Sequence, residues 1–160
     1  VFDDAFLESD FHQQIADAYY GENEIEIAFE NYEKAIELNS KNVILLNNYS
    51  YYLAINKSNL IRAENIILKA IDMAPNNANF IDTYGWIMFK KGDFNTAEEI
   101  LFKAVRLSHE INGEILEHYG DVLYKLGKTE EALLFWEKAK ITEKYSDRLL
   151  NKIHEKKYFE

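Results

Sequence analysis

Residues 79–107 read NFIDTYGWIMFKKGDFNTAEEILFKAVRL, a pattern that predicts two amphipathic helices joined by a tight turn. Gly85, Ala97 and Ala104 are small residues at sites where the two helices must approach each other closely. Gly92 stands where the first helix should end, because the left-handed backbone of a helix stop costs glycine little. One such hairpin cannot bury its apolar faces alone, so we expect further hairpins packed against it.

The same spacing of small residues recurs along the chain. Positions equivalent to Gly85 fall at Ala16, Tyr51 and Gly120, which gives steps of 35, 34 and 35 residues. An alanine follows each of these positions after twelve residues and again after nineteen: Ala28, Ala63, Ala97 and Ala132, then Ala35, Ala70, Ala104 and Ala139. So many matched small residues predict an internal repeat of about 34 residues.

The two alanines of each repeat lie seven residues apart and therefore share one helix face. Sixteen residues after the reference position, on the same face, stands a large residue: Tyr32, Ile67, Leu101 or Trp136. Small residues let a neighbouring helix approach while the large side chain fills the remaining space. We interpret all of these as core residues.

Each repeat is expected to contain two helices. The first helices are predicted near residues 4–21, 42–56, 77–91 and 112–126, and the second near 24–38, 60–73, 94–108 and 129–141. Ser58, Asp93 and Thr129 are candidate N-caps, because their short polar side chains can accept hydrogen bonds from free N–H groups of the first turn.

The composition indicates one folded domain with a sizeable core. The chain has 160 residues, of which 48% are hydrophobic and 14% aromatic, with one proline and six glycines. No apolar run reaches the roughly 18 residues of a membrane span, so we expect a soluble fragment without direct membrane insertion. Since the chain opens on Val1, we expect a piece of a longer protein or a processed product. The lack of cysteine excludes disulfides, cysteine-ligated zinc and thiol catalysis.

The net charge of -10 is concentrated at the start of the chain. Residues 1–40 hold 11 acidic side chains against one basic residue, Lys34, whereas residues 41–160 hold equal numbers of each. Nucleic acid and anionic membranes need a basic patch, so we predict neither as a partner. The acidic end is either a site for a cationic partner or a solvated face that aids solubility.

This pattern resembles the tetratricopeptide repeat, a helix-turn-helix unit of about 34 residues. The resemblance covers roughly residues 9–141, and Tyr51, which is bulky at the small site, marks its weakest repeat. The third repeat carries it best, through Tyr84, Gly85, Gly92, Phe94, Ala97, Ala104 and Leu107. The resemblance implies an all-α, right-handed α-solenoid. Residues 1–160 would form a single array, with repeats at about 9–42, 44–77, 78–112 and 113–141.

Residues 142–160 are too few for another hairpin and are predicted to form a capping helix. Its apolar face would carry Tyr145, Leu149, Leu150, Ile153 and Tyr158, and its basic outer face Lys144, Arg148, Lys152, Lys156 and Lys157. A terminal repeat needs such a cover with a polar outer face. The alternative is a basic helix that engages an acidic partner, such as the acidic start of a second copy.

The resemblance also implies that the first helix of every repeat lines an inner, concave surface. The residues at the matching positions are Asp10, Gln13, Asp17, Tyr20, Leu45, Asn48, Tyr52, Ile55, Asn79, Asp82, Trp86, Phe89, Glu114, Glu117, Asp121 and Tyr124. All except Leu45, Ile55 and Glu114 are predicted to bind a partner. An aromatic middle with acidic ends suits a protein or peptide with apolar anchors and basic flanks. For the aromatic residues Tyr52, Trp86 and Phe89, packing between neighbouring helices is the alternative.

One branch of the family grips the C-terminal carboxylate of a peptide with lysines, asparagines and an arginine. The matching residues here are Gln13, Gln14, Asp17, Tyr49, Asn79 and Thr83, and none of them is a cation. This mode of binding is therefore disfavoured. Residues 46–54 and 82–86 resemble repeats of large bacterial tetratricopeptide proteins, which implies a bacterial parent, associated with the cell envelope or cytoplasmic.

Catalytic patterns are missing from the sequence. Among four scattered histidines, only His118 has acids at helical spacing, Glu114 and Asp121, and no second helix repeats this motif as a metal site would require. There is no glycine-rich phosphate loop and no serine with an activating histidine. We predict a protein–protein interaction scaffold without enzymatic activity or cofactors. The alternative is a self-assembly module, in which the acidic first repeat meets the basic C-terminal helix of another copy.

Overall fold

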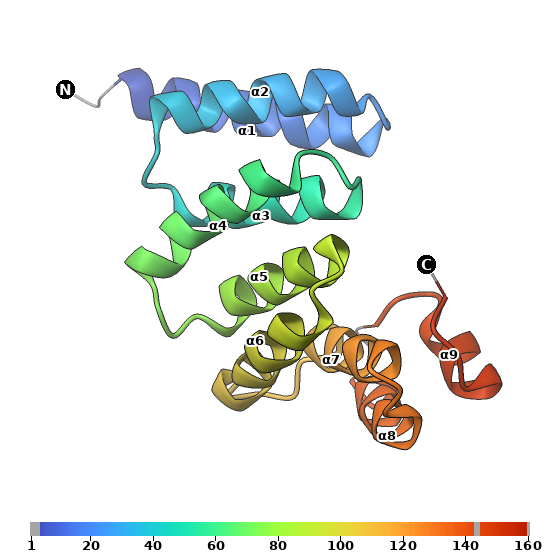
Figure 1. Ribbon diagram of the computed structural model, residues 1–160. Helices are drawn as coiled ribbons and strands as arrows, with labels where there is room; N and C mark the ends of the chain where they lie inside the picture. Colours follow the sequence, from blue (N-terminus) through green and yellow to red (C-terminus); the bar gives the residue numbers. More distant parts are fainter. Residues whose placement is uncertain (1–3, 143–144, 160) are drawn as a thin grey trace. The chain divides into compact units, whose positions relative to one another are not determined.

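The computed structural model describes residues 4–142 and 145–159, and every regular element in these ranges is a helix (Figure 1). The helices are α1 (Asp4–Gly21), α2 (Ile25–Leu38), α3 (Val43–Ile55), α4 (Leu60–Met73), α5 (Ala78–Lys91), α6 (Phe94–Leu107), α7 (Gly113–Lys125), α8 (Thr129–Lys140) and α9 (Leu149–Glu155). The ends of α1 to α8 agree with the predicted ranges to within one residue, so the all-α class and the helix pairs are confirmed. Across the described ranges, every helix is too short or too polar to cross a membrane.

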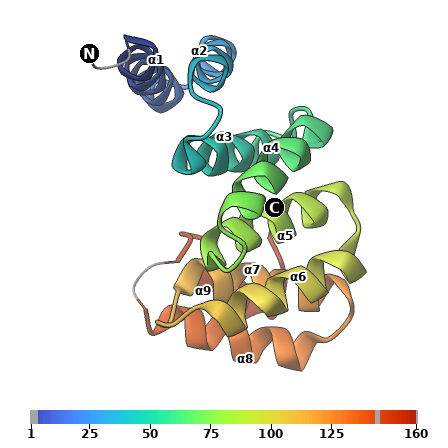
Figure 2. The ribbon, with the colours of Figure 1, turned by 90° about the vertical axis from the view of Figure 1, so that its left-hand side faces the viewer.

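Consecutive helices pair into hairpins: α1 with α2, α3 with α4, α5 with α6, and α7 with α8. Figure 2 shows the first hairpin, with α1 and α2 side by side. The chain divides into two compact units, residues 1–73 (unit 1) and 74–160 (unit 2). Unit 1 holds two hairpins, and unit 2 holds the other two together with α9. That residues 1–160 form a single array stays a prediction.

Three asparagines, 35 residues apart, begin the first helices of the second, third and fourth hairpins. The side chain of Asn42 accepts a hydrogen bond from the N–H of Leu45, that of Asn77 from Asn79 and Phe80, and that of Asn112 from Glu114 and Ile115. Each bond satisfies N–H groups that the first turn of a helix leaves without partners. The sequence reasoning missed these caps, although their spacing equals that of the repeat.

The turn between α5 and α6 follows the prediction. Gly92 has a φ of 83° and ends α5 in the left-handed conformation, and Asp93 then caps α6 by accepting from the N–H of Thr96. The other two candidate caps are wrong. Asn59, rather than Ser58, accepts from an N–H in the first turn of α4, and α8 starts at Thr129 without a side-chain cap.

The core of unit 1 forms on the stripe of small and large residues. The alanines of both repeats are fully buried, and so are the large residues between them: Ala28, Tyr32 and Ala35, then Ala63, Ile67 and Ala70. Ser9 Oγ donates to the carbonyl of Ala35 over 2.8 Å and links the middle of α1 to the end of α2. Tyr51, at the bulky site, is half-buried.

The core of unit 2 confirms the close approach of helices at its two glycines. A Cβ atom on Gly85 would lie 2.6 Å from Leu101 Cγ, and one on Gly120 would lie 2.5 Å from Trp136 Cδ1. Leu101 and Trp136 are fully buried. The large residue of each stripe therefore fills the space that the glycine leaves.

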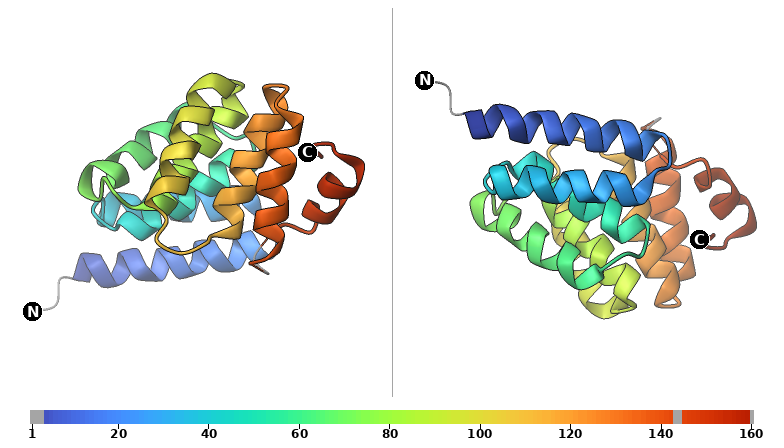
Figure 3. Two further views of the ribbon diagram at one scale, coloured as in Figure 1. Left: turned by 90° about the horizontal axis from the view of Figure 1, so that it is seen from below. Right: turned by 90° about the horizontal axis from the view of Figure 1, so that it is seen from above.

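The end of the chain departs from the predicted capping helix. Helix α9 has seven residues, and Lys156, at a φ of 52°, ends it. Figure 3 shows α9 beside α8. Leu149 is fully buried but Leu150 is 47% exposed, and Lys152, predicted for the outer face, is only 4% exposed. That assignment of Lys152 is wrong, because its ammonium pairs with two buried carboxylates. Lys144 lies outside the described residues.

Candidate protein-interaction surface

In unit 1, six of the predicted partner-binding residues lie on α1 and α3, and we call them the α1–α3 face: Asp10, Gln13, Asp17, Tyr20, Asn48 and Tyr52. The four residues on α1 recur at helical spacing and share one side of the helix. Asp10 and Asp17 are exposed, and the other four side chains are half-buried. The face therefore combines accessible carboxylates with partly accessible aromatic rings.

Side-chain contacts hold α1 and α3 together along this face. The rings of Tyr20 and Tyr52 stack with their centroids 4.0 Å apart and an angle of 26° between their planes. Asn56 Nδ2 donates to Tyr20 Oη over 3.0 Å, which fixes the phenol at one end. At the other end, Asn42 Nδ2 lies 3.4 Å from Gln13 Oε1. The stacked pair is thus fixed before any partner binds.

The aspartate that follows the reference position has the same structural role in the first and fourth repeats. Tyr32 Oη donates to Asp17 Oδ1, and Trp136 Nε1 donates to Asp121 Oδ1 over 2.9 Å. Each donor lies fifteen residues after its aspartate. Burial, reinforced by the bond to Asp17, raises the pKa of Tyr32, so the phenol stays a neutral donor. The bond holds each carboxylate in one orientation.

In unit 2, five of the predicted partner-binding residues are buried: Asp82, Trp86, Phe89, Glu117 and Asp121, with exposures between 1% and 7%. Asn79 is exposed and Tyr124 is half-buried. Trp86 stacks on Phe89 with centroids 4.6 Å apart. It also stacks on His118, at 4.0 Å, and His118 Nδ1 lies 2.9 Å from Asp82 Oδ2. These residues bind one another, and whether they also bind a partner stays a prediction.

The C-terminal segment, residues 145–159, contacts three of these buried residues. Lys152 Nζ donates to Glu117 Oε1 over 2.8 Å and to Asp121 Oδ2 over 2.7 Å. The N–H of Ser146 donates to Glu117 Oε2 over 2.8 Å, and its hydroxyl donates to Glu117 Oε1. Tyr158 meets Phe89 edge to face, with ring centroids 5.6 Å apart. The segment therefore contacts two of the predicted binding residues of α7, Glu117 and Asp121, and reaches Phe89 on α5.

Burial and neighbouring charges have opposite effects on the pKa values of Glu117, His118 and Asp121. Burial raises the pKa of Asp121 to about 6, although Lys152 favours the carboxylate. Burial also opposes the ionised form of Glu117, but Lys152 and Ser146 outweigh it and lower the pKa. For His118, burial opposes the charged ring, yet the carboxylate of Asp82 raises the pKa overall.

His118 and Asp121, which the sequence places at helical spacing, each contact other groups of the protein. Among the described residues, no group of three histidine, aspartate or glutamate side chains is placed to hold a metal ion. His118 Nδ1 is directed at Asp82, while Asp121 accepts from Lys152 and Trp136. Glu114, the other acid at helical spacing from His118, is exposed. The two buried members thus serve contacts within unit 2.

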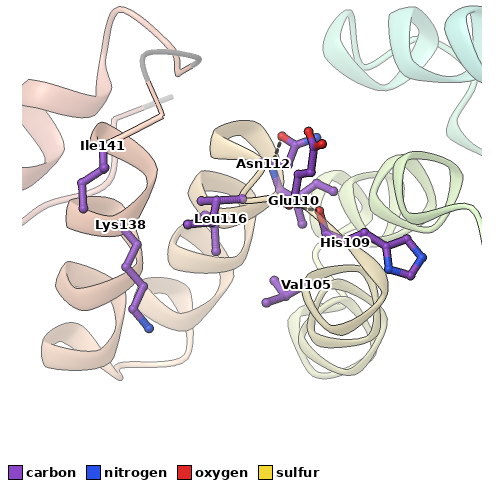
Figure 4. A pocket seen from close by; sticks show the side chains of 10 residues that line it. Val105, His109, Glu110, Asn112, Leu116, Lys138 and Ile141 are labelled. Carbon is purple, nitrogen blue, oxygen red and sulfur yellow. Dashed lines mark hydrogen bonds between the residues drawn. The ribbon is translucent and has the colours of Figure 1, made fainter.

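A pocket of about 390 Å³ opens elsewhere in unit 2, between the end of α6, the start of α7 and the end of α8 (Figure 4). Its lining consists of Val105, Ser108, His109, Glu110, Ile111, Asn112, Ile115, Leu116, Lys138 and Ile141. Asn112 is engaged in capping α7, and Ser108 Oγ donates to the carbonyl of Glu110 over 2.5 Å. The pocket therefore offers mainly aliphatic contact, and it contains none of the predicted partner-binding residues.

Similarity to known proteins agrees with the repeat geometry. Residues 9–42 match the family described as tetratricopeptide repeat, over the range predicted for the first repeat. A TPR repeat-containing protein of Methanocaldococcus jannaschii is 34% identical over 125 residues. Residues 9–42 are therefore identified as a tetratricopeptide repeat, and most of the chain is similar to a protein that contains such repeats. The matched region covers 78% of this chain but only 21% of that relative, so the chain spans about a fifth of its length.

Two solved structures share the tetratricopeptide fold of this chain. PilF of Pseudomonas aeruginosa superposes with a TM-score of 0.73 at 21% identity, covering 93% of this chain and 71% of that one. A MamA structure gives a TM-score of 0.66 at 17% identity, covering 82% of this chain and 71% of that one. These likenesses confirm the predicted all-α solenoid class. Tetratricopeptide repeats serve in general as scaffolds for protein–protein interaction.

The tetratricopeptide register explains the contacts of the C-terminal segment. Lys152 stands 34 residues after His118, and Glu117 stands 35 residues after Asp82. Lys152 pairs with Glu117 much as His118 pairs with Asp82, so α9 takes the place of the first helix of a further repeat. The sequence reasoning missed this pairing.

Proposed function

We propose that the chain is a protein-interaction scaffold whose α1–α3 face binds a protein or peptide segment with apolar anchors and basic flanks. The observation that carries this proposal is the stacked pair of Tyr20 and Tyr52 beside the exposed carboxylates of Asp10 and Asp17. Aromatic rings supply apolar contact area for an anchor residue. Carboxylates bind lysine or arginine through charge-assisted hydrogen bonds.

Two further features support binding of a cationic segment. The surrounding sequence, residues 1–40, holds 11 acidic side chains and one basic side chain, so its field attracts a basic partner. Tyr32 holds Asp17 in place, and Asn56 holds Tyr20. Side chains that are ordered beforehand lose less entropy when the partner binds.

Selection from a random peptide library on the immobilised chain tests this proposal. Enriched peptides should carry lysine or arginine around an aliphatic or aromatic anchor. Their affinity should fall at least tenfold for the double variant Asp10→Asn/Asp17→Asn, in which the amide oxygen at position 17 can still accept from Tyr32. The matched control is Glu26→Gln/Glu30→Gln, which removes the same charge from exposed positions of α2 and should change affinity less than twofold. Enrichment of neutral or acidic peptides, or an equal loss in both variants, would reject the proposal.

The aromatic part of the face needs its own variant. Tyr52→Leu keeps an apolar side chain but removes the ring that stacks on Tyr20, and it should weaken capture while the helix content is retained. Trp86→Ala is unsuitable as a probe of binding, because Trp86 is 7% exposed and packs on His118 and Phe89. Loss of capture in that variant would report the loss of packing in unit 2.

Self-assembly is a second candidate function, favoured by one observation on α1. Phe6, Leu7 and Phe11 are 52%, 72% and 63% exposed, and exposed apolar groups of this kind mark interaction surfaces. A second copy could supply exposed cations from its own C-terminal segment. Light scattering at high protein concentration and low salt should then detect oligomers that dissociate as salt is added. A monomer under all of these conditions would reject this alternative.

A further inference from the structure

In unit 2, the C-terminal segment contacts residues whose equivalents in unit 1 stay accessible. Asp121 and Asp17 follow the reference position of their repeats and accept from equivalent aromatic donors, but Asp17 is exposed whereas Asp121 is 1% exposed. In unit 2, the C-terminal segment adds a contact at this position, because Lys152 places its ammonium against Asp121 and Glu117. The chain thereby shows which chemistry this surface accepts.

The three protons of one ammonium match the acceptors that the surface presents. Lys152 Nζ lies 2.8 Å from Glu117 Oε1, 2.8 Å from Asp121 Oδ1 and 2.7 Å from Asp121 Oδ2. Six residues later, Tyr158 contacts the ring of Phe89, and the ammonium of Lys125 lies 4.5 Å from the centroid of Tyr158. The three N–H donors of one lysine ammonium thus satisfy all three of these carboxylate oxygens at once. The surface thus recognises a lysine together with an aromatic ring.

Helix α9 is attached to unit 2 more through the contacts of Lys152 and Tyr158 than through buried apolar side chains. Its seven residues bury only Leu149 and Lys152 fully, while Ile153 is half-buried and Leu150 is exposed. A permanent cap would bury an apolar stripe over several turns. Buried ion pairs add little net stability, because removing both charges from water offsets most of their attraction. The segment is therefore suited to exchange with a competing ligand.

We propose that Phe89, Glu117 and Asp121 form a second binding surface, which takes a partner segment with a lysine followed six residues later by tyrosine or phenylalanine. Residues 145–159 are the built-in occupant that such a partner displaces. This inference rests on the proposed function, since it treats the chain as a scaffold. The proposal specifies the chemical class of one partner. It also implies that the wild-type chain binds this partner weakly, because residues 145–159 compete for the same surface.

A labelled peptide with the sequence of residues 145–159 tests the proposal on the full chain. Lys152→Glu repels the chain's own segment from Glu117 and Asp121, so this variant should bind the peptide at least tenfold more tightly than wild type. Lys156→Glu makes the same charge change at an exposed residue of the segment and should bind like wild type. A peptide with glutamate in place of the lysine should bind none of the proteins.

A second variant covers the case in which Lys152→Glu fails to fold. Tyr158→Ala removes only the ring contact with Phe89, and it should raise the affinity for the peptide severalfold while circular dichroism stays unchanged. Failure of the peptide to bind folded Lys152→Glu, or folded Tyr158→Ala if only that one folds, would show a fixed cap and overturn the proposal. Equal binding to wild type and to the variant would also overturn it, since the surface would then not be occupied by the chain's own segment.

The outcome is separable from that of the proposed function. Asp10→Asn/Asp17→Asn changes only unit 1 and should leave binding of the 145–159 peptide to Lys152→Glu unaltered. If the 145–159 peptide binds but no library peptide binds the α1–α3 face, the function proposed for unit 1 is rejected and the binding surface of unit 2 is supported. Capture on that face without peptide binding would do the reverse.

Discussion

His118 lies flat on Trp86, with ring centroids 4.0 Å apart, while its Nδ1 is 2.9 Å from Asp82 Oδ2. The histidine and the aspartate are 6% and 5% exposed, so this ionisable pair is buried next to the ring of Trp86. Water screens such a pair poorly, which makes its protonation state matter for stability. The folding of unit 2 is therefore coupled to the proton that His118 carries.

Stability should depend on pH through His118. Burial opposes its charged form, but Asp82, with smaller help from Glu114 and Asp121, raises the pKa above its ordinary value of 6.5. The stabilising contribution is therefore complete below pH 6.5 and is lost as the pH rises through the raised pKa. The free energy of unfolding, from urea titrations, should therefore fall as the pH rises above about 6.5 and the ring loses its proton. His118→Asn should flatten this decline, whereas exposed His109→Asn should keep it. An unchanged slope in His118→Asn would contradict the assignment.

Alanine at the two helix-contact glycines should destabilise unit 2 unequally. A Cβ on Gly120 would meet the rigid indole of Trp136 at 2.5 Å and the carbonyl of Ala132 at 3.2 Å, whereas a Cβ on Gly85 meets the movable side chain of Leu101 at 2.6 Å. Overpacking of this kind costs about 1–3 kcal/mol. Gly120→Ala should therefore lower the melting temperature more than Gly85→Ala. Gly21→Ala, with nothing within 4 Å of its Cβ, is the control and should leave it nearly unchanged.

Loss of charge at equivalent aspartates should affect the two units differently. Asp121→Asn leaves buried Lys152 with one carboxylate, and at pH 8 it should cost about 1–3 kcal/mol of unfolding free energy. Asp17→Asn, at an exposed site, should change it by less than about 0.5 kcal/mol. Because burial raises the pKa of Asp121 to about 6, the wild-type carboxyl is protonated at pH 5 and the cost should shrink there. Equal costs for both variants at pH 8 would contradict the structure.

The helices could be predicted because the same spacing of small and large apolar residues recurs in each repeat. Gly85 and Gly120 stand where a side chain would collide with a large partner, and the alanine stripe is buried throughout. These features follow from local spacing. The asparagine caps could have been found in the same way, since Asn42, Asn77 and Asn112 share the repeat period.

Whether each predicted binding residue is exposed or buried could not be predicted from the sequence of its own helix. Asp17 and Asp121 are equivalent in sequence, but Asp17 is exposed whereas Asp121 is buried and is contacted by Lys152 from 31 residues away. Lysines are almost always exposed, so the apolar pattern of residues 142–160 placed Lys152 on the outer face. The residue that contacts Asp121 is a lysine, and the spacing of apolar residues does not predict an ion pair of this kind.

Asp10 and Asp17 on the α1–α3 face are exposed, while Glu117 and Asp121 in unit 2 are buried against the chain's own Lys152. Carbodiimide labelling of carboxyl groups in the full chain, read out by mass spectrometry, tests this difference most directly. In wild type, Asp10 should be labelled rapidly, while Glu117 and Asp121 should be protected until Lys152→Glu releases them. Labelling of Glu117 and Asp121 in wild type at the rate of Asp10 would contradict the account.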